Sequence, residues 1–324
     1  MTRLKGRLIP VHMTSGTALR PSWDELPLSL RGALASRLGA IAGVQLQTGG
    51  FTPGLAVRLR LADGERIFAK GIPVDHALAD KYRAEAETVL MLPSFAPAPR
   101  LRWHAEIAGW VVLAFDDIDG RHADLSPGSP DIDSVVTTVA GLAPVLTPCP
   151  VPGAPSAGTE LASLVHGWRE LAAVGGPGRN DWTARHLDQL AAAETRWLAA
   201  ADGKTLVHGD ISASNLLIAA DRSVFLVDWA QPVCGAPWLD VADLVPHLIL
   251  AGHTPASAEK IMAAASAWNQ AEPDTITSYA IAFAGYWARM SRKPAPPGVP
   301  HLRAHQAQAA KAAITWVAHR TGWS

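Results

Sequence analysis

The sequence predicts an α+β protein of two lobes, a small sheet-rich N-terminal lobe over residues 1–116 and a larger, mainly helical lobe over residues 117–324. Short apolar strands dominate the first part of the chain, whereas segments with helical periodicity fill most of the rest. With 324 residues, 48% of them apolar, the chain can bury a substantial core.

The N-terminal lobe is expected to alternate helices and strands. Leucines and alanines recur at helical spacing over residues 27–43. Two strands joined by the turn dipeptide at residues 63–64 then form a hairpin. A helix is predicted over residues 75–92, and a continuous apolar strand over residues 110–115.

The second lobe is predicted to be helical around a few short strands. Residues 160–173 and 181–201 have helical periodicity, and three more helical segments fill much of residues 236–324. Between them the sequence predicts three strands, TLV, NLLI and SVFLVD. Polar residues stand at the ends of these strands, so this is where we expect chemistry.

The stretch LVHGDISASNLLI holds an acid and an amide five positions apart, Asp210 and Asn215, and Asp228 ends the following strand. Two acids and an amide can therefore converge at strand ends. Such a trio suits phosphoryl transfer, in which a carboxylate orients the attacking hydroxyl and hard oxygen ligands hold Mg²⁺ on the phosphates. We expect Asp210 to be the catalytic carboxylate, and Asn215 and Asp228 to hold the metal.

Together, HGDISASN and LVDWA resemble the catalytic loop and metal-binding segment of the aminoglycoside phosphotransferase family, small-molecule kinases with a bilobal protein-kinase-like fold. The resemblance implies that Lys70 grips the α and β phosphates of the nucleotide and that Glu85 on the next helix is its ion-pair partner. Glu87 is the alternative, but Glu85 lies on the apolar stripe of its helix, where an acid should be paired.

The resemblance also implies where the rest of the nucleotide lies. VVLAFDDIDG resembles the hinge between the lobes, so the backbone of Ala114, Phe115 and Asp116 would meet the base. The turn GGFTPG lacks the three spaced glycines of protein kinases, yet the backbone of Gly50, Phe51 and Thr52 can still cover the phosphates.

A later segment, GAPWLDVADL, resembles the part of the family that follows the metal aspartate. The resemblance implies that Asp240 braces the catalytic loop by hydrogen bonds, whereas Asp243 is interpreted as a helix surface charge. The short span from Asp228 to Asp240 argues against a protein kinase, which needs a longer activation segment. Ser212 stands where protein kinases carry a lysine, so charge neutralisation should fall on Mg²⁺ and Lys70.

The acceptor is the least determined part of the prediction. From Ala230 to Ser324 the chain has seven Lys and Arg against five Asp and Glu, a balance that disfavours polycationic aminoglycosides. We expect a neutral or anionic hydroxyl compound, such as a nucleoside-type or glycosylated antibiotic. Ser212, Tyr286 and Arg289 are candidate substrate contacts, with a solvated helix-end charge as the alternative for Arg289.

The predicted function is therefore a kinase that uses ATP or GTP and Mg²⁺ to phosphorylate a small molecule, with antibiotic resistance as the favoured role. A sugar or metabolite kinase is one alternative. A catalytically silent nucleotide-binding regulatory module is another, but it would lack the lysine, the base or a metal ligand. The sequence does not choose between ATP and GTP or set the oligomeric state.

Charge and cysteine content argue against other classes of protein. The 28 Lys and Arg balance 29 Asp and Glu, so no basic field is available for nucleic acid or an anionic membrane. The longest nearly apolar run, residues 279–288, is far shorter than the roughly 20 residues of a membrane helix. Only two cysteines occur, which suits a reducing compartment, so we expect a cytoplasmic protein.

Overall fold

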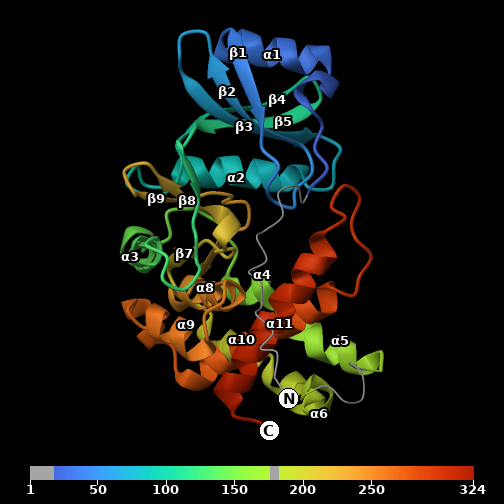
Figure 1. Cartoon of the computed structure of the whole chain (residues 1–324), viewed down its shortest axis with the longest axis vertical. Coiled ribbons are helices and arrows are strands. Elements are labelled where there is room, and N and C mark those ends of the chain that lie inside the picture. The colour runs from blue at the N-terminus through green and yellow to red at the C-terminus, as the bar shows by residue number, and fades with distance from the viewer. Residues whose placement is uncertain (1–17, 176–181) are drawn as a thin grey trace, which may run out of the picture.

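The computed structural model describes residues 18–175 and 182–324, which form two lobes stacked along the long axis of the molecule (Figure 1). The parts of the predicted elements that fall on residues 1–17 and on residue 181 lie outside the described residues. The architecture is the expected α+β arrangement, with a sheet in the upper lobe and mostly helices in the lower one.

The upper lobe is a five-stranded antiparallel sheet in the order β1-β2-β3-β5-β4. One face carries α1 and the other α2 (Figure 1). Each face has its own core, built with Leu30 and Leu34 of α1 or with Tyr82 and Ala86 of α2. The elements are a 3₁₀ turn (Trp23–Glu25), α1 (Leu28–Leu38), β1 (Ile41–Leu46), β2 (Leu55–Leu61), β3 (Arg66–Pro73), α2 (Ala79–Met91), β4 (Leu101–Ile107) and β5 (Trp110–Asp116).

The predicted helix over residues 27–43 is too long. Helix α1 ends at Leu38 because Gly39 adopts φ +105°, a conformation that favours glycine. The next six residues, IAGVQL, form the edge strand β1 and pair with β2. Because the alanine and glycine of this strand continue the small-residue pattern of the preceding helix, sequence periodicity did not reveal where the helix ends and the strand begins.

The lower lobe is mainly helical, with two small sheets next to the lobe junction. Segments predicted as long helices over 160–173 and 181–201 are broken into short turns. The helices are α3 (Ile132–Val145), α4 (Ala157–Glu160), α5 (Gly167–Ala173), α6 (Trp182–Arg185), α7 (Leu187–Ala193), α8 (Trp238–Leu250), α9 (Pro255–Met262), α10 (Pro273–Met290) and α11 (Leu302–Thr321), with 3₁₀ turns at Leu161–His166, Arg196–Ala200, Ala213–Asn215 and Ser266–Gln270. The strands are β6 (Gly120–His122), β7 (Thr205–Val207), β8 (Leu216–Ala219), β9 (Val224–Leu226) and β10 (Val233–Gly235).

Helix α10 is the central helix of the lower lobe and packs against α5 and α11. It crosses α5 at a pair of glycines, since a Cβ at Gly167 would lie 2.2 Å from the carbonyl carbon of Gly285. The core around this crossing is rich in buried tryptophan, including Trp168 and Trp197. The last turns of α10 emerge toward the lobe junction with Tyr286 and Arg289. Across the described ranges, no helix combines the length and the hydrophobicity that a membrane span requires.

Candidate active site

Lys70 lies in the middle of β3 and contacts two carboxylates that come from different parts of the chain. Its Nζ is 2.5 Å from Oε2 of Glu85 on α2 and 3.0 Å from Oδ1 of Asp228, which follows β9. Glu87, the alternative partner, is exposed on the other side of α2. The Lys70 cluster, meaning Lys70, Glu85 and Asp228, therefore joins the two lobes.

Burial and charge act in opposite directions on these three groups. Burial by itself lowers the pKa of Lys70, but the carboxylates of Asp228 and Glu85 outweigh it and raise that pKa, so the ammonium stays charged. Burial raises the pKa of Glu85 to about 7, although Lys70 opposes the shift. The charge of Lys70 lowers the pKa of Asp228 against the effect of burial. The lobe junction thus contains a permanent cation at the position expected to meet phosphates.

Asp228 adopts a strained backbone conformation that turns its side chain toward Lys70. Its φ of +69° lies in the left-handed region, which non-glycine residues rarely occupy and which costs about 1–3 kcal/mol when it occurs. The next residue, Trp229, is buried, and its Nε1 donates to the carbonyl of Leu226 at 3.0 Å. The segment after Asp228 is consequently anchored in the core of the lower lobe.

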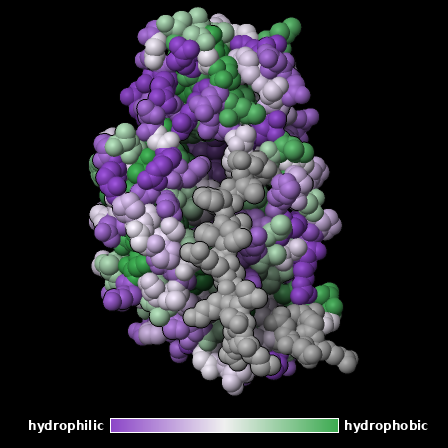
Figure 2. Space-filling view, in the orientation of Figure 1, coloured by the Kyte–Doolittle hydropathy of each residue, from purple (hydrophilic) through white to green (hydrophobic). Residues whose placement is uncertain are grey.

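Asp210 and Asn215 lie in the loop between β7 and β8 and contact each other directly. The Nδ2 of Asn215 donates to Oδ2 of Asp210 at 3.0 Å and to the main-chain carbonyl of Asp210 at 2.8 Å. Both hydrogen bonds use the amide nitrogen, so the amide oxygen is left as a hard ligand atom. Figure 2 shows that the surface is hollowed and hydrophilic where the two lobes meet.

Asp240, in the first turn of α8, braces the catalytic loop as the resemblance implied. Its carboxylate accepts hydrogen bonds from the backbone N–H of His208 at 2.9 Å and of Gly209 at 3.0 Å. The ring of His208 extends this support, since its Nε2 lies 3.1 Å from the carbonyl of Val227. Burial lowers the pKa of His208 to about 4, so the imidazole is neutral and holds the loop in place.

Asp243 is not a surface charge, and the prediction for it is wrong. Its carboxylate is buried and accepts a hydrogen bond of 2.6 Å from the hydroxyl of Tyr279 on α10. Water reaches Asp210 in the cleft, yet desolvation by the surrounding protein, together with the negative charges of Asp228 and Asp243, raises the pKa of Asp210. The three-residue spacing from Asp240 places Asp243 on the same helix face, a signal that the sequence offered.

The residues predicted to form the hinge, 114–116, lie at the end of strand β5. Strand β5 pairs with β3 on one side and with β4 on the other, so Ala114 and Phe115 use their backbone groups within the sheet. The backbone N–H of Asp116 likewise donates to the carbonyl of Arg100 at 2.9 Å. The chain leaves the sheet at residues 117–119, whose backbone lies beyond the pairing of β5.

The glycine-rich turn, residues 49–54, joins β1 to β2 and reaches across to the lower lobe. Gly50 and Gly54 have φ of +83° and +123°, and a Cβ at Gly54 would lie 2.5 Å from the carbonyl oxygen of Gly71. Both positions therefore require glycine. Phe51 at the tip of the turn has its ring 4.7 Å from that of His305 on α11. Phe51 and Thr52 thus lie at the front of the lobe junction.

The candidate substrate residues Tyr286 and Arg289 lie in the last turns of α10. Arg289 is mostly buried, pairs with Glu170 at 2.6 Å and stands 5.7 Å above the ring of Tyr286, so a solvated helix-end charge is the wrong interpretation. Burial raises the pKa of Tyr286, and the charged groups that act on it are Arg289, Asp210 and Arg303. The negative charge of Asp210 therefore acts on Tyr286.

Ser212, a predicted substrate contact, and Arg303, which was not predicted, are both held by hydrogen bonds. Ser212 is buried in the catalytic loop, with its Oγ 2.8 Å from Oγ of Ser214. Arg303 was missed by the sequence argument. Its guanidinium donates to the carbonyl of Pro294 at 2.9 and 3.0 Å and to Gln306, so it is fixed at the start of α11.

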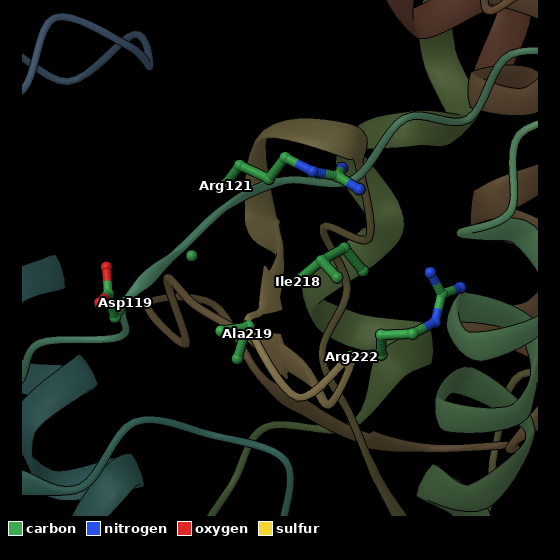
Figure 3. A pocket seen from close by; sticks show the side chains of 7 residues that line it. Asp119, Arg121, Ile218, Ala219 and Arg222 are labelled. Atoms are coloured by element: carbon green, nitrogen blue, oxygen red, sulfur yellow. The ribbon is translucent and has the colours of Figure 1, made fainter.

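A separate hollow of about 430 Å³ lies beside β6 and β8 (Figure 3). It is lined by Asp119, Gly120, Arg121, Ile218, Ala219, Ala220 and Arg222, of which only Asp119, in the segment after β5, is also part of the site discussed above. Its two arginines already have partners, because Arg121 pairs with Asp131 at 2.6 Å and Arg222 donates to the carbonyl of Pro130 at 2.5 Å. We assign no chemistry to this hollow.

Residues 54–275 match the model of the phosphotransferase enzyme family, APH. The chain belongs to this family. It is accordingly a phosphotransferase that acts on hydroxyl acceptors, a small-molecule kinase of the APH family with a protein-kinase-like fold. The matched segment includes Lys70, Glu85, Asp210, Asn215 and Asp228, but it ends before the tip of α10.

Solved structures of low sequence identity have the same fold. Choline kinase LicA from Streptococcus pneumoniae is 13% identical with a TM-score of 0.60, over 88% of this chain and 98% of that one. A thermostable mutant of aminoglycoside phosphotransferase APH(4)-Ia, in a ternary complex with ADP and hygromycin B, is 13% identical with a TM-score of 0.58, over 91% and 100%. AMP-bound spectinomycin phosphotransferase APH(9)-Ia is 10% identical with a TM-score of 0.53, over 85% and 93%. A comparison with curated protein sequences gave no match.

Proposed function

We propose that this APH-family enzyme transfers the γ-phosphoryl group of a nucleoside triphosphate to a hydroxyl of a neutral or anionic small molecule. The observation that carries the proposal is the link between the Lys70 cluster and the Asp210–Asn215 pair, since the N–H of Val227, next to Asp228, donates to the carbonyl of Asn215 at 3.0 Å. Lys70 would bind the α and β phosphates, and Asp210 would orient the acceptor hydroxyl. Structures with ADP, AMP and AMP-PNP among the similar proteins support a nucleotide donor.

The chemistry follows from the raised pKa of Asp210. A carboxylate that holds a proton more tightly is a better acceptor for the proton of the attacking hydroxyl. As the acceptor oxygen bonds to the γ-phosphorus, the bond from phosphorus to the β–γ bridging oxygen breaks and the nucleoside diphosphate leaves. Asn215 keeps the carboxylate oriented throughout, through its bond to Oδ2.

The donor atoms at the junction fit Mg²⁺. The carboxylate of Asp228 and the amide oxygen of Asn215 are hard ligands, and Mg²⁺ needs only one or two carboxylates together with water and phosphate oxygens. Over the described ranges, no group of three or more His, Cys, Asp and Glu side chains could hold an ion without such help. When bound, the metal would neutralise charge on the phosphates.

The backbone of residues 117–119 would meet the base, while Gly50, Phe51 and Thr52 would cover the phosphates. Recognition of the base through backbone groups leaves both ATP and GTP as donors. We also propose a cytoplasmic location, since the chain has two free cysteines and no disulfide among the described residues.

We infer the acceptor class from the charges around Tyr286, a candidate acceptor contact. Apart from Asp210 itself, the groups acting on Tyr286 are the cations Arg289 and Arg303. A polycation would be repelled there, whereas a neutral or anionic molecule would be accommodated. A nucleoside-type or glycosylated antibiotic, and hence a resistance role, is the acceptor we favour, and a sugar or metabolite is second. A silent module has no support, because the lysine, the base and both metal ligands are present.

A transfer assay tests this proposal. Purified protein is given Mg²⁺, labelled ATP or GTP and a panel of antibiotics, sugars and peptides, and we expect label on a neutral or anionic hydroxyl compound. Asp210→Asn should lower turnover by about 10²–10⁴-fold while nucleotide binding is retained. Asp133→Asn, an exposed change on α3, is the matched control. Full turnover in Asp210→Asn would refute the assignment.

A further inference from the structure

Arg20 lies outside the segment that matches the family and reaches the glycine-rich turn from the N-terminal side. Its Nη2 donates to the carbonyl of Gly49 at 2.7 Å, and its Nη1 lies 3.4 Å from the carbonyl of Gly54. A Cβ on Gly50 would be 3.3 Å from Nη2. The guanidinium therefore spans the turn that is expected to cover the phosphates.

The backbone next to Arg20 is fixed to the lower lobe. The N–H of Leu19 donates to the carbonyl of Gly298, in the loop between α10 and α11, at 2.7 Å. Gly298 also faces the glycine-rich turn, because a Cβ there would lie 3.3 Å from the Cβ of Pro53. Arg20 is thus held where the two lobes and the turn meet.

The charge of Arg20 belongs to the same electrostatic group as the Lys70 cluster. Burial lowers the pKa of Arg20, whereas Tyr82 and Asp228 raise it. The ring of Tyr82 lies 5.1 Å from Nζ of Lys70, so both cations act on one tyrosine. The Nε of Arg20 is buried and has no hydrogen-bond partner among the described residues, which leaves a donor unused.

We propose that Arg20 contacts the β and γ phosphates of the donor and supplies the cation that the catalytic loop lacks at Ser212. A guanidinium has five N–H donors in a planar fork that suits phosphate oxygens, and only two of its nitrogens are used by the carbonyls of the turn. The inference rests on the proposed function, since it concerns how the same site binds its nucleotide.

The test compares binding of two nucleotides that differ in their phosphates. Affinities for AMP-PNP and AMP are measured by calorimetry with Mg²⁺ for the wild type, Arg20→Ala and Arg20→Lys, and for Arg60→Ala as an exposed control on β2. Arg20→Ala should weaken AMP-PNP about 10- to 100-fold, as expected when charge-assisted hydrogen bonds are lost, and AMP less than about 2-fold. Arg60→Ala should change neither.

Arg20→Lys distinguishes a role in phosphate binding from a role in supporting the glycine-rich turn. Lysine keeps the positive charge but cannot span the carbonyls of Gly49 and Gly54. Recovery of AMP-PNP affinity to within about 5-fold of the wild type supports a phosphate contact. The inference would be overturned if Arg20→Lys bound AMP-PNP as weakly as Arg20→Ala, or if Arg20→Ala lost equal affinity for AMP-PNP and AMP. Either result would leave the proposed function standing. A wild type that binds neither nucleotide would refute the proposed function itself.

Discussion

Lys70 has two carboxylate partners at similar distance, so either one should hold its charge when the other is removed. At an effective dielectric constant of about 20, contacts of 2.5 and 3.0 Å correspond to attractions of about 7 and about 5.5 kcal/mol before desolvation. The side chain of Asp228 is 39% exposed, against 3% for Glu85, so solvent screening reduces the second value further.

These values predict a non-additive pair of substitutions. Glu85→Gln should cost about 1–2 kcal/mol of unfolding free energy and Asp228→Asn about 0.5–1 kcal/mol, because in each case one anion remains beside Lys70. The double variant leaves the ammonium of Lys70 buried without a carboxylate and should cost about 3–5 kcal/mol. The excess over the sum is therefore about 1.5–2 kcal/mol when the lower or the upper ends of these ranges are compared.

Guanidinium unfolding of the three variants measures this excess, and Glu87→Gln on the exposed side of α2 is the control. The control should lie within about 0.5 kcal/mol of the wild type. If the unfolding free energies lost in Glu85→Gln and in Asp228→Asn add up to the loss in the double variant within about 0.5 kcal/mol, the two carboxylates do not share Lys70.

Two further substitutions test the loop and the turn. Asp243→Asn removes a negative charge that raises the pKa of Asp210. Because the base works when deprotonated, the activity of this variant should extend to lower pH. A pH profile of kcat/KM that matches the profile of the control Asp133→Asn would contradict this expectation. Gly54→Ala places a Cβ 2.5 Å from a β3 carbonyl at φ +123° and should reduce nucleotide affinity about 10-fold or more. Its control, Gly64→Ala, has φ +93° but nothing within 4 Å of the new Cβ, so it should cost only about 1–3 kcal/mol of stability. Equal nucleotide affinities in the two variants would refute the close-packing argument.

The motifs were predictable because each belongs to a local pattern. Lys70 ends an alternating apolar stretch, Glu85 lies on an apolar helix stripe, and Asp210, Asn215 and Asp228 stand at strand ends. Local patterns place residues on elements, and the β-hairpin, α2 and the loop after β7 then bring these side chains together. Strand ends alone indicated Asp210, Asn215 and Asp228, whereas the roles of Lys70 and Glu85 were implied by the family resemblance.

The missed features depend on contacts between parts of the chain that are far apart. Asp243 is buried only because Tyr279, 36 residues later, lies against it. The pairing of β5 on both sides, on which our proposal for residues 117–119 rests, is a property of the whole sheet. Arg20 reaches the glycine-rich turn because Leu19 is fixed to a loop near the other end of the chain.

The contact between Phe51 and His305 gives the donor and acceptor sites a common border. The ring of His305 lies 6.2 Å from that of Trp287, beside Tyr286, so α11 contacts both the turn proposed to cover the phosphates and the residues proposed to meet the acceptor. We therefore expect the contact between Phe51 and His305 to couple the release of nucleotide to the release of product, because one pair of rings borders both proposed sites.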